Sequence, residues 1–146
     1  MIIADTNVVS ELMKQAPDAA VLAWARRQPV AALSICVVTV EEIERGLSRL
    51  PQGKRRRDLT QRSNGLVDAF ADTIAIYDVT AARTTGANSG RRRAAGRPFS
   101  LADAQIAGIC LAGGHELTSS STRSPPPRCR WVAGSRWHPM SRVSVR

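Results

Sequence analysis

Three acidic residues occupy positions from which a sheet protein can bring them to one edge. Asp5 directly follows the apolar run 2–4, Glu42 lies one turn into the helix expected after a second apolar run, and Asp103 lies in the first turn of a later helix. Three carboxylates at close range raise one another's pKa unless a cation joins them. Oxygen ligands select hard divalent ions such as Mg²⁺ or Mn²⁺, and such an ion activates water for attack on a phosphodiester. The acids therefore indicate metal-assisted hydrolysis.

Helix capping is the alternative explanation for two of these acids. Thr39 with Glu42, and Ser100 with Asp103, both match the pattern in which a hydroxyl caps a helix and an acid three residues later reaches back. Asp5 fits this explanation less well, because an acid placed directly after a buried strand needs a cation or a donor as its partner. Position in the sequence leaves both explanations open.

Strands and helices alternate along the predicted chain. Strands are expected at 2–4, 31–38, 73–77 and from 115. Helices are expected to begin at Thr6-Asn7, Pro17, Thr39, Lys54, about Thr80 and Ser100. This order predicts an α/β protein with a parallel sheet covered by helices on both faces, whose ligands gather beyond the carboxyl ends of the strands.

Two local features qualify the predicted helices. The helix over 54–70 has an apolar stripe, but Asn64-Gly65 is expected to interrupt it. Asp78 is interpreted as the cap of the helix near Thr80 rather than as a site residue. Cys36 and Cys110 fall on apolar faces and are expected to fill the core.

Four stretches resemble PIN-domain proteins, and within them the ribonuclease toxins of the VapC and FitB type. They are MIIADTNVVSE at 1–11, VTVEEIERG at 38–46, LPQGKRR at 50–56 and LADAQIA at 101–107. The resemblance extends over residues 1–117 in the expected order. It implies a PIN-like three-layer α/β/α sandwich with a central, mainly parallel sheet. It further implies a Mg²⁺- or Mn²⁺-dependent endoribonuclease, the toxin of a type II toxin–antitoxin pair, with a cognate antitoxin, an RNA substrate and a homodimer.

The same resemblance assigns roles to particular residues. The family's acidic, metal-binding positions fall on Asp5, Glu42 and Asp103. Thr6 and Asn7 share the motif of Asp5 as supporting residues, and Asn7 would position an acid or a metal-bound water. The neighbouring glutamates at 41 and 44 do not match metal positions.

The family pattern fails after Leu117. Ser121 and Ser124 stand where the family places an Asn or Asp and an Asp, so the fourth acid is missing. Hydroxyl groups bind Mg²⁺ less well than carboxylates do. The alternative function is therefore a catalytically impaired PIN module that binds the antitoxin without cleaving RNA.

The composition changes at the same point and separates 1–117 from an atypical segment, 118–146. That segment holds six of the 21 Lys and Arg residues and no acid, and it is rich in Ser and Pro. Three explanations stay open: an arginine-rich tail that grips RNA phosphates, a disordered extension, and a shift of reading frame near codon 118. Translating the gene in its other frames distinguishes the third from the first two.

Basic clusters at 54–57 and 91–93 have two interpretations, an RNA-backbone contact or solvated helix ends. Aromatic residues make up 4% of the chain, so a platform for stacking RNA bases is not evident. No apolar run approaches the roughly 20 residues that span a bilayer. Three scattered cysteines fit neither a disulfide framework nor a zinc site, and we expect a cytoplasmic protein without a membrane partner.

Overall fold

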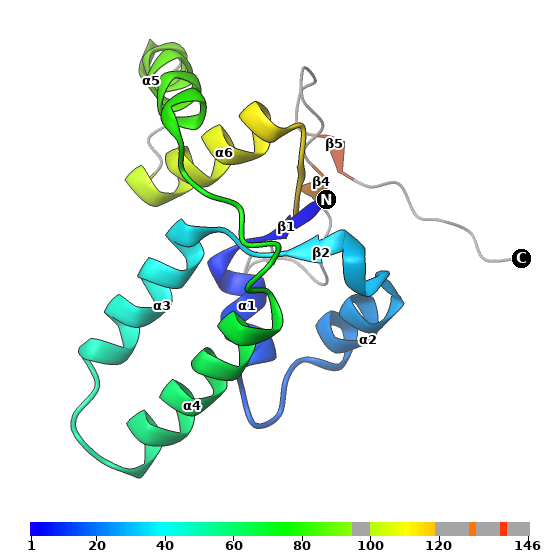
Figure 1. Cartoon of the computed structure of the whole chain (residues 1–146), viewed down its shortest axis with the longest axis vertical. Helices are drawn as coiled ribbons and strands as arrows, with labels where there is room; N and C mark the ends of the chain where they lie inside the picture. Colours follow the sequence, from blue (N-terminus) through cyan, green and yellow to red (C-terminus); the bar gives the residue numbers. More distant parts are fainter. Residues whose placement is uncertain (95–99, 119–128, 131–137, 140–146) are drawn as a thin grey trace, which may run out of the picture.

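Three short parallel strands form the sheet that positions the candidate site. A computed structural model (Figure 1) describes residues 1–94, 100–118, 129–130 and 138–139. The strand order is β2-β1-β3. The strands are β1 (Ile2–Ala4), β2 (Leu33–Ser34) and β3 (Glu116–Thr118). Ile3 of the central strand pairs with Ser34 on one side and Leu117 on the other. The parallel arrangement brings the carboxyl ends of all three strands to one edge.

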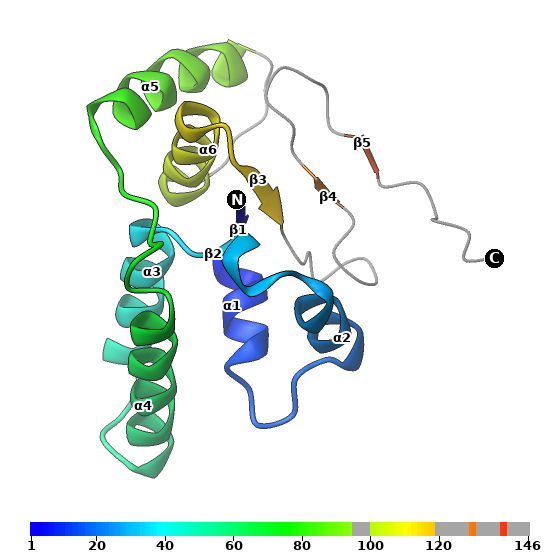
Figure 2. The same cartoon turned by 45° about the vertical axis from the view of Figure 1, so that its right-hand side comes forward.

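Helices connect these strands in the expected order. They are α1 (Thr6–Leu12), α2 (Ala19–Arg27), α3 (Val37–Ser48), α4 (Lys54–Ala69), α5 (Val79–Ala94) and α6 (Leu101–Gly113), with a 3₁₀ turn, η1, at Val30–Ala32. Figure 2 shows α5 beside α6 on one side of the sheet, and the α3–α4 pair projecting away from it. A separate antiparallel pair joins β4 (Cys129–Arg130) to β5 (His138–Pro139). No helix in the described ranges is long and apolar enough to cross a membrane.

The two faces of the sheet bury different sets of helices, except that α3 contributes Val38 to one cluster and Ile43 to the other. Successive residues of a strand point to opposite faces. Ile3 packs in a cluster with apolar residues of α5 and α6, while Ala4 packs with those of α1, α2 and α3. Likewise, Cys36 belongs to the cluster of Ile3, and its neighbour Ile35 belongs to the cluster of Ala4. The predicted α/β architecture, with a parallel sheet between helical layers, is confirmed.

Two predicted strands are wrong in extent. The segment 31–38 holds the turn η1, only two residues of strand, and the start of α3 at Val37. The segment 73–77 forms a single parallel bridge, Cys36 to Ala75, instead of a strand. The early start of α3 removes the extended neighbour that a longer ladder requires. In addition, the Ser34 hydroxyl donates to the Thr73 carbonyl at 2.6 Å, so this carbonyl already has a side-chain donor.

The predicted interruption of the long helix is also wrong. α4 runs through Asn64 and Gly65, although a glycine in a helix interior costs about 1 kcal/mol relative to alanine. Leu59 and Leu66 on the inner face of α4 pack against the core cluster of α1 and α3. The Ser63 hydroxyl donates to Glu44 of α3 at 3.2 Å. Tertiary packing thus outweighs the local preference.

The ends of α6 follow the local signals closely. Ser100 is the N-cap, and Gly114 ends the helix in the left-handed region with φ 63°. Asp78 caps α5, since its carboxylate accepts from the Ala81 amide at 2.8 Å, as expected. Cys36 and Cys110 are both fully buried and fill the core, also as expected.

Candidate functional site

Asp5 lies at the carboxyl edge of the central strand and begins α1. Its backbone N–H donates to the Thr118 carbonyl at 3.0 Å, which extends the β1–β3 ladder by one bond. Its carboxylate accepts from the Val8 amide at 2.9 Å, so Asp5, and not Thr6 or Asn7, is the N-cap. The residue is buried. Strand and helix together fix this carboxylate at the edge where ligands of parallel sheets gather.

Glu42 reaches the same place from α3. The Thr6 hydroxyl donates to Glu42 Oε2 at 2.5 Å, which joins residues 36 positions apart. Thr6 is the first residue of α1, directly after Asp5. The contact therefore places the half-buried Glu42 carboxylate beside the start of the helix that Asp5 caps.

The capping explanation for Glu42 is wrong. α3 begins at Val37 with Cys36 as its N-cap, so Thr39 and Glu42 lie inside the helix. Thr39 is fully buried, and its hydroxyl donates to the Ala4 carbonyl at 3.5 Å. This weak bond ties the first turn of α3 to the end of β1, a positioning role that sequence reasoning missed. The only indication of this role in the sequence is that a threonine stands within an otherwise apolar run.

The capping explanation for Asp103 is confirmed. Its backbone amide donates to Ser100 Oγ at 3.0 Å, and its Oδ2 accepts from the Ser100 amide at 3.2 Å. The side chain is exposed. Because the chain passes from the far end of α6 into the first residue of β3, the start of α6 points toward the carboxyl edge of the sheet. A cap and a site residue are compatible here, since the capping box uses only one carboxylate oxygen.

The chemistry of these donors fits a hard divalent ion, but their observed geometry does not form a complete site. All three offer oxygen ligands, which suit Mg²⁺ or Mn²⁺. Within the described ranges, however, no three Asp, Glu, His or Cys side chains lie together closely enough to hold a metal ion. Each of the three acids accepts a hydrogen bond from the protein instead. The metal-binding assignment therefore stays a prediction.

The remaining residues considered for the site are exposed, bonded to other side chains, or outside the described ranges. Asn7 is exposed on the first turn of α1. Glu41 pairs with Arg45, and Glu44 accepts from Ser63, so both of these glutamates have structural partners. Ser121 and Ser124, at the positions where the family pattern has an Asn or Asp and an Asp, lie outside the described residues.

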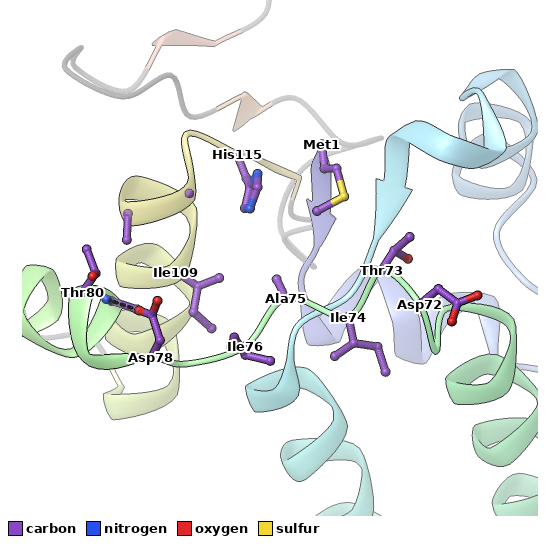
Figure 3. Close-up of a pocket in the computed structure, with 13 residues that line it drawn as sticks. Met1, Asp72, Thr73, Ile74, Ala75, Ile76, Asp78, Thr80, Ile109 and His115 are labelled. Atoms are coloured by element: carbon purple, nitrogen blue, oxygen red, sulfur yellow. Dashed lines mark hydrogen bonds between the residues drawn. The ribbon is translucent and has the colours of Figure 1, made fainter.

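A cavity of about 480 Å³ lies at the opposite end of the strands (Figure 3). Met1 and His115, which precede β1 and β3, line its rim, and Ile74 and Ile109 line its wall. Asp78, also at the cavity, is engaged as the cap of α5. Burial and the nearby N-terminal amino group lower the pKa of His115, which favours the neutral imidazole. The cavity contains none of the three candidate acids.

Comparisons with known proteins agree with this architecture. The family model described as PIN domain matches residues 2–120. The chain is 36% identical to "VapC ribonuclease Y4jK" of Sinorhizobium fredii over 123 residues, which cover 84% of this chain and 88% of the relative. It is 29% identical to "Toxin FitB" of Neisseria gonorrhoeae over 119 residues, 81% of this chain and 84% of the toxin.

A solved structure shows the same arrangement of elements. The crystal structure of FitAcB from Neisseria gonorrhoeae aligns with a TM-score of 0.73 and 26% identity, covering 80% of this chain and 85% of that one. The family match spans the sheet, all six described helices and the three candidate acids. The chain belongs to the PIN-domain family.

Proposed function

We propose that this chain is the toxin of a type II toxin–antitoxin pair and that it hydrolyses RNA phosphodiesters with Mg²⁺ or Mn²⁺. The relatives named as a ribonuclease and as a toxin support this reaction. The observation that carries the proposal is the Thr6–Glu42 hydrogen bond. It joins a predicted acid of α3 to the residue that follows Asp5, so two of the predicted ligands approach the same edge of the sheet.

In this mechanism Asp5, Glu42 and Asp103 would hold the divalent ion. When bound, the ion supplies an activated water and neutralises charge that develops on the phosphate. The burial of Asp5 and its bond to the Val8 amide hold that carboxylate in one orientation. Thr6 orients Glu42, and Asn7 is proposed to hydrogen-bond the attacking water. Asp103 would offer the ion its second carboxylate oxygen, which the capping box does not use.

Asp5→Asn tests the reaction. Asparagine caps a helix about as well as aspartate, so the fold is expected to survive while the negative charge is lost. We expect cleavage of a single-stranded RNA to fall at least about 100-fold, since one acid–base or metal-ligating group contributes about that much. Asp18→Asn, the same change at the N-cap of α2, is the matched control. An Asp5→Asn protein that cleaves RNA at the rate of the control contradicts the proposal.

A chelator gives the second arm of this experiment. EDTA is expected to abolish cleavage by the wild-type chain, and added Mn²⁺ or Mg²⁺ is expected to restore it. Cleavage that persists in EDTA contradicts the metal-dependent mechanism even if Asp5→Asn is inactive.

A catalytically impaired PIN module is the second candidate function. It is favoured by the finding that no three potential ligands in the described ranges form a metal-holding group. Calorimetric titration with Mn²⁺ separates the two candidates. Tight binding together with chelator-sensitive cleavage supports the nuclease, whereas an inert pocket in a chain that binds its antitoxin with nanomolar affinity supports the binding module.

The partners remain proposals of the same kind. A cognate antitoxin is expected from the resemblance to toxins of this type, and a small DNA-binding reading frame next to this gene would identify it. The homodimer and residence in the cytoplasm stay predictions.

A further inference from the structure

A second cavity, of about 620 Å³, lies where the end of α1 meets the first half of α4. Its wall is strongly basic, with four cations and one carboxylate. The residues that matter here are Lys14, Lys54, Arg55, Asp58, Leu59 and Arg62. Lys14 stands far from the basic run 54–57 in the sequence, and Arg62 lies one turn beyond that run on the same helix, so the folded chain extends the run into a larger cationic surface. We call this surface the α1–α4 basic cavity.

Two of the four cations have a hydrogen-bond or ion-pair partner in the protein, and the other two have no ion-pair partner among the described residues. Arg62 donates to the Met13 carbonyl at 3.0 Å, and Lys14 forms an ion pair with Glu11 at 2.5 Å. Lys54 and Arg55 are exposed, and no carboxylate of the described residues lies within salt-bridge distance of either. The described lining therefore carries an excess of positive charge, and two of its cations have no ion-pair partner among the described residues.

The position of these cations is unfavourable for the helix itself. The first turn of α4 holds Lys54, Arg55, Arg56 and Arg57 and no acid, and the N-cap, Gly53, has no side chain to accept a hydrogen bond. The N-terminus of a helix carries partial positive charge, which favours acids there and disfavours cations. Residue types that destabilise their own helix in this way are expected at functional positions. An anion bound at the cavity would relieve the repulsion.

The lining residues favour a phosphate backbone over a peptide or a base. Peptide-binding sites depend on apolar or aromatic anchors, and Leu59 is the one large apolar side chain among the described residues of this wall. Base stacking needs an aromatic ring, and the described residues of the lining include none. Arg55 and Arg62 are two turns apart on α4, about 10 Å along the axis, a spacing that suits separate phosphates of one strand.

We propose that the α1–α4 basic cavity binds the phosphate backbone of the RNA substrate at a distance from the cleaved bond. The proposal rests on the proposed ribonuclease function. Asp5 begins α1 and Lys14 follows its end, a separation of about 13 Å at the helical rise. A single strand of roughly four stacked nucleotides covers this distance at 3.4 Å each. Such contacts give affinity without reading sequence.

The test measures RNA binding without cleavage. The double variant Lys54→Gln/Arg55→Gln and the matched control Arg26→Gln/Arg27→Gln, an exposed pair on α2, remove the same charge. Fluorescence anisotropy of a labelled 12-nucleotide single-stranded RNA is followed in EDTA, between about 50 and 200 mM salt. Losing two phosphate contacts is expected to reduce the slope of log K against log salt by about 1.4. Affinity at low salt is expected to fall about tenfold more than in the control.

An unchanged slope, equal to that of the control variant, overturns the proposal. A poly-glutamate peptide of the same length distinguishes the other class of occupant. If the double variant loses affinity for the peptide while its RNA binding is intact, the cavity belongs to an acidic protein partner and the proposal is wrong. Because the assay contains no divalent ion, its result is independent of the Asp5→Asn cleavage experiment. The failure of one can therefore be distinguished from the failure of the other.

Discussion

Replacing Thr6 by valine removes one hydroxyl group while nearly preserving the volume of the side chain. The hydroxyl donates to Glu42 Oε2 at 2.5 Å at the half-buried start of α1. A hydrogen bond to an ionised group contributes about 1.5–3 kcal/mol net, and partial exposure places this one near the lower end. If Glu42 is held by this bond in the transition state, a loss of about 1.4 kcal/mol lowers the cleavage rate about tenfold.

The assay is steady-state cleavage of a short single-stranded RNA, with kcat and KM determined separately. Thr6 acts through Glu42 in the proposed mechanism, so we expect the loss in kcat and little change in KM. Thr6→Ser keeps the hydroxyl and is expected to restore most of the rate. Thr84→Val is the matched control, because the Thr84 hydroxyl donates to the Thr80 carbonyl within α5, away from the acids.

The unfolding free energy must be measured in parallel by urea titration. A Thr6→Val protein that is merely destabilised would contain a smaller folded fraction. Both the Thr6→Ser change and a lower temperature would restore that fraction. Full cleavage activity in a folded Thr6→Val protein would refute the reasoning, because Glu42 would then need no positioning by α1. Equal losses in the valine and serine variants would refute it too, since the hydroxyl would not be the cause.

Two further predictions concern the packing of α6 on α5 and the sheet. Gly108→Ala places a Cβ 2.0 Å from Thr85 Oγ1 and 2.8 Å from the Ala81 carbonyl oxygen, so we expect about 1–3 kcal/mol of destabilisation in urea titration. Gly86→Ala, in open space on α5, is the control and is expected to be neutral or stabilising. Burial, followed by the neighbouring Cys36 thiol, raises the pKa of Cys110 to about 12. At pH 8 its thiol should therefore stay protonated, and peptide mass spectrometry should find it alkylated by iodoacetamide only after unfolding. Rapid alkylation of the native chain would contradict this.

Features set by neighbouring residues were predictable from the sequence. Asp5 was expected at the end of β1 because an acid interrupts an apolar run there, and the structure has it at that edge. The limits of α6 followed from Ser100 and from the glycine pair that ends the helix. In each case the signal and the structure it predicts lie within a few residues, so little depends on the rest of the chain.

Features that depend on distant contacts were not predictable. Whether 73–77 becomes a strand depends on how far its neighbour stays extended, and α3 ends that extension at Val37. The sequence assigned Glu42 either to a cap or to a metal, whereas its observed partner, Thr6, lies 36 residues away. The α1–α4 basic cavity likewise brings Lys14 beside residues of α4, and nothing in the basic run at 54–57 indicates that Lys14 joins it.

The three candidate acids take part in contacts that stabilise the fold without the proposed cation. Here Asp5 and Asp103 cap the starts of α1 and α6, where the partial positive charge of a helix terminus stabilises a carboxylate. Glu42 accepts from a hydroxyl at the start of α1. Each carboxylate therefore has a hydrogen-bond donor of its own within the fold, and the proposed ion would add to these contacts rather than replace them.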